Sequence, residues 1–122
     1  MFNKKQLTDF QNDFRAACRQ HAVVLDGPLE IHVVCFFFKP KSNKNAYPVG
    51  RPDVDNFLKS ILDSMNPVYL KLKDPVTGNP QRIISGWNGF WNDDSQVVDA
   101  RIQKRWLVHG TDPFISVTVG QI

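Results

Sequence analysis

The sequence predicts an α+β fold in which a small mixed β-sheet packs with two main helices. Two segments, 4–22 and 53–66, carry apolar residues at helical spacings of three and four. Three further segments, 29–38, 97–108 and 114–119, have strand patterns, and a turn-rich stretch at 67–86 has the pattern of a hairpin. The order helix, strand, helix, hairpin, strand, strand therefore indicates α+β.

The length and composition indicate one domain, residues 1–122, with a single core. No apolar run approaches the ~20 residues of a membrane span, and the first residues lack the apolar region of a secretion signal. Cys18 and Cys35 fall on apolar patterns, so we interpret them as reduced core residues. Together these features predict a cytoplasmic protein with no membrane partner.

The first helix and strand contribute apolar faces to the predicted core, as does the second helix. Leu7, Phe10 and Phe14 form one face of the helix at 4–22. The strand at 29–38 is apolar on both faces from Val33 onward, which predicts a central place in the sheet.

A polar loop, residues 39–50, joins this strand to the second helix. It carries Lys39, Lys41, Lys44 and Tyr47 together with two prolines, and we expect it to be mobile. Its lysines could contact phosphates, and Tyr47 a base or sugar. A solvated loop without a partner is the alternative, but this loop leads directly into an acidic stretch.

The second helix begins near Pro52 or Asp53, and Pro67 ends it. The hairpin of 67–86 follows, and then the strands at 97–108 and 114–119 complete the sheet.

Two acidic pairs are candidate ligands of a divalent metal ion. Asp53 and Asp55 lie at the loop-to-helix junction, where both can face one ion, with Lys59 one turn after Asp55. Alternatively, these acids only cap the helix and interact with its dipole, which stabilises the helix by about 0.3–2 kcal/mol. In that case Lys59 forms an i,i+4 salt bridge with Asp55.

The second pair, Asp93 and Asp94, precedes a strand, and alternation directs only one of them into a site. We prefer Asp94, while a simple turn is the alternative. Gathering such carboxylates costs about 1–4 kcal/mol per close pair. A hard cation such as Mg²⁺ removes this cost and prefers oxygen ligands.

The charge balance favours a polyanionic partner. The net charge is +3, but setting aside Asp53, Asp55, Asp93 and Asp94 leaves 8 of the 12 acidic residues against 15 basic ones. A basic surface around an acidic pocket suits nucleic acid, although an ordinary mildly basic domain has a similar composition.

The motifs R-P-D-V-D-N-F-L-K-S-I-L-D-S-M-N and F-W-N-D-D-S-Q-V-V-D-A-R-I-Q-K together resemble the RusA family of Holliday junction resolvases. The matching residues are Arg51, Asp53, Asp55, Asn56, Lys59, Asp63, Asn66, Trp91, Asp93, Asp94, Gln96, Val97 and Lys104. The resemblance implies a homodimeric, Mg²⁺-dependent endonuclease, with Mn²⁺ as a substitute, that cuts opposed strands of a four-way DNA junction.

The resemblance also implies residue roles. Asp53, Asp55 and Asp94 correspond to the metal-binding and catalytic carboxylates, Asp93 lies close by, and Lys59 corresponds to the essential lysine. The positions expected to contact DNA are Lys39, Lys41, Lys44, Arg51 and Lys104. The setting implied is the cytoplasm of a bacterial or phage-infected cell.

Two departures bear on the substrate. The chain starts almost at its first helix, whereas family members usually open with a strand, and the hairpin of 67–86 separates the two motifs. A nuclease for flaps or other branched DNA, and a non-catalytic junction-binding protein, therefore remain alternatives to a resolvase.

Overall fold

The computed structural model describes residues 4–50, 53–84, 86–107 and 112–122, with the side chain of residue 82 not described. Its elements in chain order are α1 (Lys4–Cys18), β1 (Leu29–Phe37), α2 (Val54–Met65), β2 (Tyr69–Lys73), β3 (Pro80–Ile84), the short 3-10 helix η1 (Asp94–Gln96), β4 (Val97–Trp106) and β5 (Phe114–Gln121). The predicted α+β class is confirmed. The chain divides into two compact units, residues 27–59 with 97–122, and residues 2–26 with 60–96.

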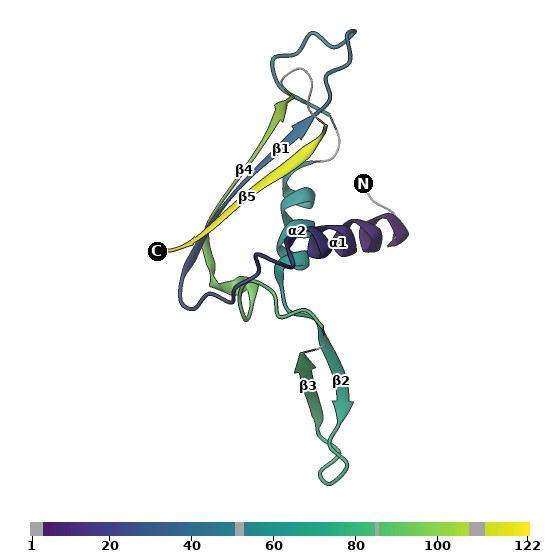
Figure 1. Ribbon diagram of the computed structural model, residues 1–122, viewed down its shortest axis with the longest axis vertical. Coiled ribbons are helices and arrows are strands. Elements are labelled where there is room, and N and C mark those ends of the chain that lie inside the picture. The colour runs from purple at the N-terminus through teal and green to yellow at the C-terminus, as the bar shows by residue number, and fades with distance from the viewer. Residues whose placement is uncertain (1–3, 51–52, 85, 108–111) are drawn as a thin grey trace. The chain divides into compact units, whose positions relative to one another are not determined.

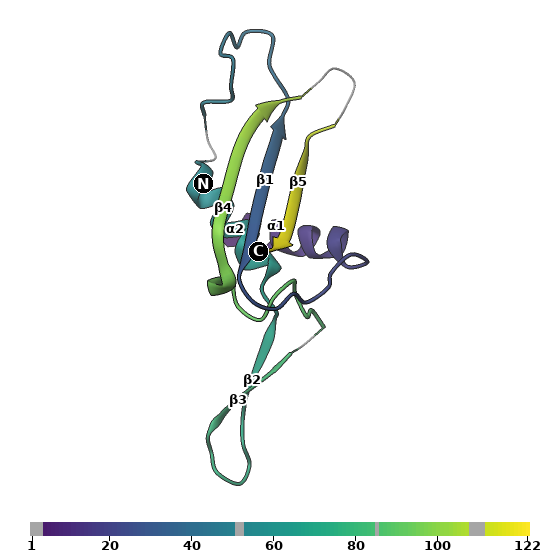
Figure 2. The same cartoon turned by 90° about the vertical axis from the view of Figure 1, so that its left-hand side faces the viewer.

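The first unit is built on a three-stranded sheet of order β4-β1-β5 (Figures 1 and 2). Strand β1 runs parallel to β4 and antiparallel to β5, so the sheet is mixed. The central position predicted for the strand after the first helix is confirmed. Strand β1 ends at Phe37, and Leu107 N–H extends the pairing with β4 by donating to Phe37 O at 2.9 Å.

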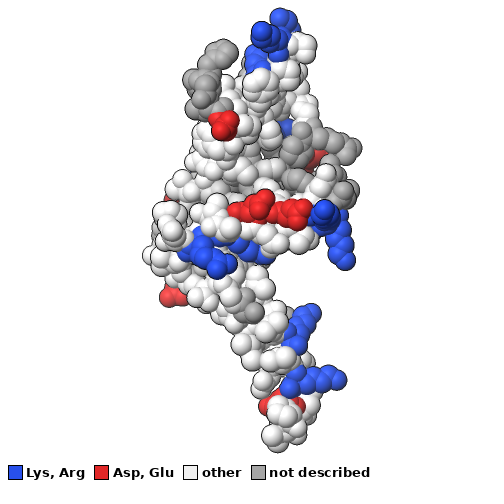
Figure 3. Space-filling view, turned by 45° about the vertical axis from the view of Figure 1, so that its right-hand side comes forward, with Lys and Arg blue, Asp and Glu red and all other residues white. Residues whose placement is uncertain are grey.

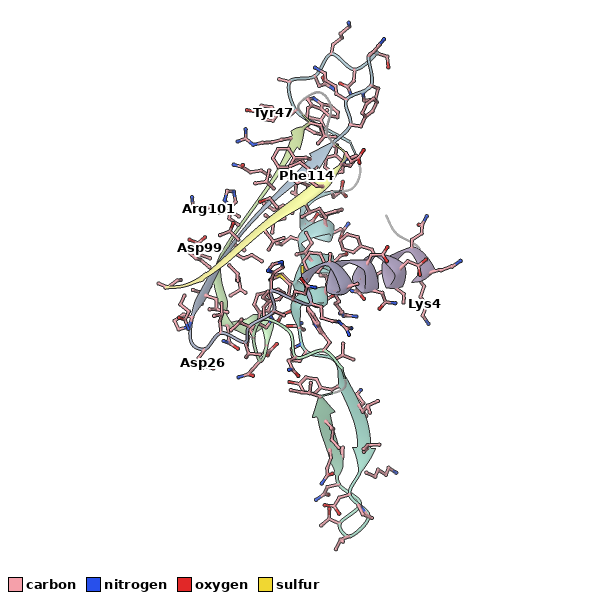
Figure 4. All side chains as sticks on the ribbon, in the orientation of Figure 1. Lys4, Asp26, Tyr47, Asp99, Arg101 and Phe114 are labelled. Atoms are coloured by element: carbon pink, nitrogen blue, oxygen red, sulfur yellow. The ribbon has the colours of Figure 1, made fainter. Side chains whose placement is uncertain are left out.

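Alternate residues of β1 form the core of this unit. Leu29, Ile31, Val33 and Cys35 are each at most 2 % exposed. The Phe57 ring of α2 meets the Phe37 ring edge-on at 6.4 Å. On the opposite face of the sheet, β4 carries polar side chains: Figure 4 shows Asp99 and Arg101 pointing from β4 away from the start of α2, and their side chains are 3.9 Å apart.

The second unit contains α1, the end of α2 and the β2–β3 hairpin. Ile61, Met65 and Trp91 are almost completely buried within it. Arg15 of α1 donates to the carbonyl oxygens of Ser64 and Asp63, at 3.2 and 3.4 Å, which satisfies groups near the end of α2 that lack helical partners. The predicted hairpin is confirmed, with β2 and β3 paired antiparallel.

A glycine permits the chain to return against the end of α2. Gly89 has a positive φ of 74°, and a Cβ atom there would lie 2.5 Å from Met65 O. The next residue, Phe90, donates its N–H to the same carbonyl at 2.9 Å. Only glycine fits here, because a side chain would both strain the backbone and collide with Met65.

Some boundaries differ from the sequence prediction. Helix α1 ends at Cys18 rather than near residue 22, where His21 N–H closes a turn onto Cys18 O at 2.9 Å. Arg19, Gln20 and His21 are polar and exposed, so no apolar contact extends the helix. The end predicted for the strand at 97–108 lies partly outside the described residues. Cys18 and Cys35 are free thiols, as expected. None of the described helices has the length and apolar character that crossing a bilayer requires.

Candidate functional site

The start of α2 presents two carboxylates to solvent. Asp53 lies just before the helix, and its carbonyl oxygen accepts the first helical hydrogen bond, from Phe57 N–H at 3.0 Å. Asp55 lies in the first turn, and both aspartates are exposed. The positive end of a helix dipole stabilises carboxylates at such positions. The loop-to-helix junction therefore brings Asp53 and Asp55 to one helix end, as the sequence predicts.

Lys59 is exposed on the same helix, one turn after Asp55. No ion pair joins these two side chains among the described residues. The Lys59 ammonium is therefore directed to solvent rather than held by its helical neighbour, and a surface ion pair at this spacing would contribute little in any case.

Asp94 is held by a chain of hydrogen bonds in the second unit. The fully buried Trp91 donates its indole N–H to Asn66 Oδ1 at 2.5 Å. The Nδ2 atom of Asn66 then donates to Asp94 Oδ2 at 3.1 Å. Because the indole can only donate, it fixes which way the Asn66 carboxamide points. The buried core thereby orients Asp94, and this role of Asn66 was not predicted.

Asp93 has different surroundings from Asp94. It is exposed, and the Ser95 hydroxyl donates to its Oδ2 at 3.0 Å. Hydrogen bonding, first of all from Ser95, lowers the pKa of Asp93 below its ordinary value. Asp94 is half-buried instead. The two acids therefore differ in exposure, but the expected strand alternation is wrong, because Asp94–Gln96 forms the 3-10 helix η1 and is not extended.

Gln96 closes the loop that carries both acids. Its Oε1 accepts the backbone N–H groups of Asn92 and Asp93, at 2.9 and 3.3 Å. Its Nε2 donates to Leu25 O at 3.1 Å. One side chain thus ties the acidic loop to the segment after α1. Its position within W-N-D-D-S-Q is the only sequence signal that could have suggested this role.

The predicted DNA-contacting residues fall into two groups. Lys39, Lys41 and Lys44 are exposed on the loop of residues 39–50, and Figure 3 shows blue Lys and Arg side chains over this loop at the top of the view. Lys104 instead is half-buried and donates to Gly50 O at 2.6 Å. Arg51 lies outside the described residues.

A second strand residue also anchors the loop. Trp106 donates its indole N–H to Asn45 O at 2.9 Å. With Lys104, it fixes two points of the segment that leads to Asp53. Strand β4 therefore positions the approach to the acidic helix end, a function that the sequence pattern does not indicate.

The aspartates fit a hard divalent cation by donor type, since Mg²⁺ prefers carboxylate oxygens. Asp53 and Asp55 lie in the first unit, and Asp93 and Asp94 lie in the second. Among the described residues, no three His, Cys, Asp or Glu side chains are grouped so that they could hold a metal ion. The structure thus shows two carboxylates at one helix end and a third held by Asn66.

Comparison with known proteins identifies a family. The family model described as Endodeoxyribonuclease RusA matches residues 1–74. This range includes Asp53, Asp55 and Lys59 and ends before the second acidic pair. Neither the curated proteins nor the solved structures gave a match.

Proposed function

Because the chain belongs to the RusA family of endodeoxyribonucleases, we propose that it resolves Holliday junctions by paired, Mg²⁺-dependent hydrolysis of phosphodiester bonds. The chain is a nuclease of a family that acts on branched DNA, and the family match covers more than half of it. The proposal adds the cation, the residue roles and the symmetric cutting of opposed strands in recombination and repair.

The observation that carries the proposal is the presence of Asp53 and Asp55 at one helix end, within the matched range. Exposed carboxylates repel DNA phosphates, so a protein that only bound DNA would gain nothing from them. Metal binding converts the same oxygens into an attractive site for a phosphate.

We assign the metal ligands as Asp53, Asp55 and Asp94, with Asp93 close by. A divalent cation held by these oxygens would lower the pKa of a bound water and would add positive charge to attract the phosphate. Lys59, which is exposed one turn after Asp55, stabilises the negative charge that develops on the phosphoryl oxygens. Asn66 keeps Asp94 oriented through its hydrogen bond.

The basic loop holds the substrate. Lys39, Lys41 and Lys44 are exposed and contact phosphates, which supplies affinity without sequence information. Arg51 adds a further cation next to Asp53 in the chain. Two copies of the chain, related by a two-fold axis, place one site on each of two opposed strands. Such an enzyme acts on DNA in the cytoplasm of a bacterial or phage-infected cell.

The test uses a synthetic four-way junction, a matching duplex and a flap, each incubated with the protein in Mg²⁺ and in EDTA. Symmetric nicks confined to the junction and dependent on Mg²⁺ are expected. Cutting of the flap but not the junction would move the assignment to a nuclease for other branched DNA. Junction binding without cutting in Mg²⁺ or Mn²⁺ would indicate a non-catalytic accessory protein.

A further inference from the structure

A pocket of about 300 Å³ lies between the loop of residues 39–50 and the ends of β1 and β4, entirely within the first unit. We propose that it holds one unpaired nucleobase of the branched DNA. The inference rests on the proposed function and adds to it a base-binding site at the loop that precedes Asp53 in the chain. The pocket volume is at the lower end of the range for small-molecule sites, which suits a single flat ring.

The walls of the pocket are suited to a nucleobase face. Phe37, Phe38 and Trp106 line it together with Pro48. Phe38 is 71 % exposed, so its ring presents a large apolar surface toward solvent. Isolated exposed aromatics are common, but here one forms part of a concave site. Aromatic rings stack on bases of any sequence, because every base has a π-face.

Two carboxamides give the pocket hydrogen-bonding groups. Asn43 and Asn45 both line it. Asn43 Oδ1 accepts Asn45 N–H at 2.9 Å, which orients the Asn43 side chain. A carboxamide presents a donor and an acceptor side by side, which matches the edge of a base.

The pocket is held in shape by the strand beneath it. Lys104 donates to Gly50 O at 2.6 Å and Trp106 donates to Asn45 O at 2.9 Å. Within the loop, Asn43 N–H donates to Pro40 O at 3.0 Å. A site that is already formed loses less freedom when its ligand binds. The loop therefore presents a formed cavity and not only a set of charges.

The residues around the pocket indicate that the bound nucleobase belongs to DNA. Lys39, Lys41 and Lys44 are exposed on the same loop, where they can bind the phosphates on either side of the captured nucleotide. A base in an intact duplex is stacked and cannot enter such a pocket. At a branch point the continuous base stack is interrupted, so a base there leaves the stack at a lower cost than a base inside a duplex. The pocket therefore selects branched over duplex DNA.

The experiment measures junction affinity in Ca²⁺, for a series of junctions with one abasic nucleotide at successive positions around the branch point. For the wild-type protein, removing the captured base should weaken binding about tenfold at one position in each symmetric half. Phe38→Ala and Asn45→Ala should weaken binding to the intact junction and remove this dependence on the base. Asn45→Ala keeps the backbone carbonyl that Trp106 requires.

Phe114→Ala is the matched control. Phe114, labelled in Figure 4, is an exposed aromatic of β5 in the same unit, and it does not line the pocket. This variant should keep the full abasic effect. Thermal unfolding of every variant establishes that each is folded, and gel filtration shows whether truncating Phe38 alters self-association.

The inference is overturned if removing the base at each position in turn leaves the affinity of the wild-type protein unchanged, or if Phe38→Ala and Phe114→Ala retain equal abasic effects. A Phe38→Ala variant that only loses self-association would instead show that a second copy occupies the pocket. Cleavage of the unmodified junction in Mg²⁺ is measured in parallel. If the wild-type protein cuts it and no abasic effect exists, the pocket proposal alone fails, whereas a protein that neither binds nor cuts the junction refutes both.

Discussion

Lys104 Nζ donates a 2.6 Å hydrogen bond to the backbone carbonyl oxygen of Gly50, so strand β4 holds the chain three residues before Asp53. The lysine side chain is half-buried. A hydrogen bond from a charged donor is stronger than a neutral one. The charged Lys104 side chain therefore helps to hold the loop in place, whereas the three exposed lysines on the loop face solvent.

Replacing Lys104 with alanine should slow cleavage by about tenfold, because the loop before Asp53 loses one charge-assisted hydrogen bond. Single-turnover cleavage at increasing Mg²⁺ should also show a higher half-saturating concentration. The salt dependence of binding should stay unchanged, whereas a direct phosphate contact would lower its slope by about 0.9. Arg105→Ala is the control, since the guanidinium of Arg105 is held by Gln103 and not by the loop.

Asp55→Asn should reduce cleavage by about 10²-fold or more, because it removes one of the proposed anionic metal ligands. Junction binding should be kept or improved, since one repulsive charge is lost. Gel-shift and cleavage measurements on the same junction separate the two effects. Asp99→Asn, an exposed carboxylate on the far face of the sheet, should change neither. Normal cutting by Asp55→Asn would show that the site lies elsewhere.

Replacing Lys39, Lys41 and Lys44 together with alanine should weaken junction binding and lower its dependence on salt. Each lost phosphate contact reduces the slope of log K against log salt by about 0.9, so the total change is up to about 3. Lys4→Ala with Lys5→Ala, exposed at the start of α1, is a control for general loss of charge. An unchanged slope in the triple variant would remove the loop from the DNA interface.

Asn66→Ala should destabilise the protein, because it leaves the buried Trp91 indole N–H without its acceptor. The expected cost is about 1–3 kcal/mol, which lowers the thermal midpoint by about 5 °C or more. Asn66→Asp should in addition reduce cleavage, since a carboxylate then faces Asp94 where an amide N–H stood. Asn92→Ala is the control, because the contacts of Asn92 use its backbone. An unaltered midpoint in Asn66→Ala would contradict this account.

Cys35 makes stability depend on pH in the alkaline range. Burial raises the pKa of this thiol from 9.0 to about 11, against a smaller opposing effect of the Lys104 charge. Below pH 9 the thiol is protonated in both states. Between pH 9 and 11 only the unfolded state ionises, so the free energy of unfolding falls as pH rises, by about 1.4 kcal/mol per unit. The contribution of the protonated Cys35 thiol to stability is therefore fully present below the pKa of the unfolded state, and it is lost as pH rises through the pKa of the folded state.

Urea unfolding at about pH 8 and about pH 10.5 checks this dependence. The loss of stability should be smaller in Cys35→Ala than in the wild-type protein. Cys18→Ala should change the difference less, because Cys18 is only half-buried. Equal pH dependence in wild type and Cys35→Ala would mean that the thiol does not contribute.

Local features of the sequence predicted the elements of this fold well. Helix α2 was placed almost correctly, because its apolar face has a clear period and Pro67 ends it. The exposed pair Asp53 and Asp55 was also placed correctly, since the junction of loop and helix is a local property. Helix α1 was predicted too long, because its last polar residues are compatible with a helix but have nothing apolar to pack against.

Contacts between distant residues could not be predicted in this way. The hydrogen bond from Lys104 ends on a backbone carbonyl, which every residue possesses, so no side-chain pattern marks it. The link between Asn66 and Asp94 depends on how the chain returns past Gly89. The alternation argument at Asp94 failed for a related reason, since the Gln96 side chain captures nearby backbone N–H groups and turns the segment into η1.

The parallel pairing of β1 with β4 has a consequence for how the protein folds. Leu29 pairs with Val97, so α2, the hairpin and both acidic segments lie in the connection between two adjacent strands. Closing so long a loop lowers the entropy of the chain before the contacts that offset this loss have formed. Folds that depend on pairing between distant segments therefore form slowly. During synthesis, the ribosome must release β4 before the central strand gains this neighbour. The helix end with Asp53 and Asp55 is therefore made early, while the strand that carries Lys104 arrives late.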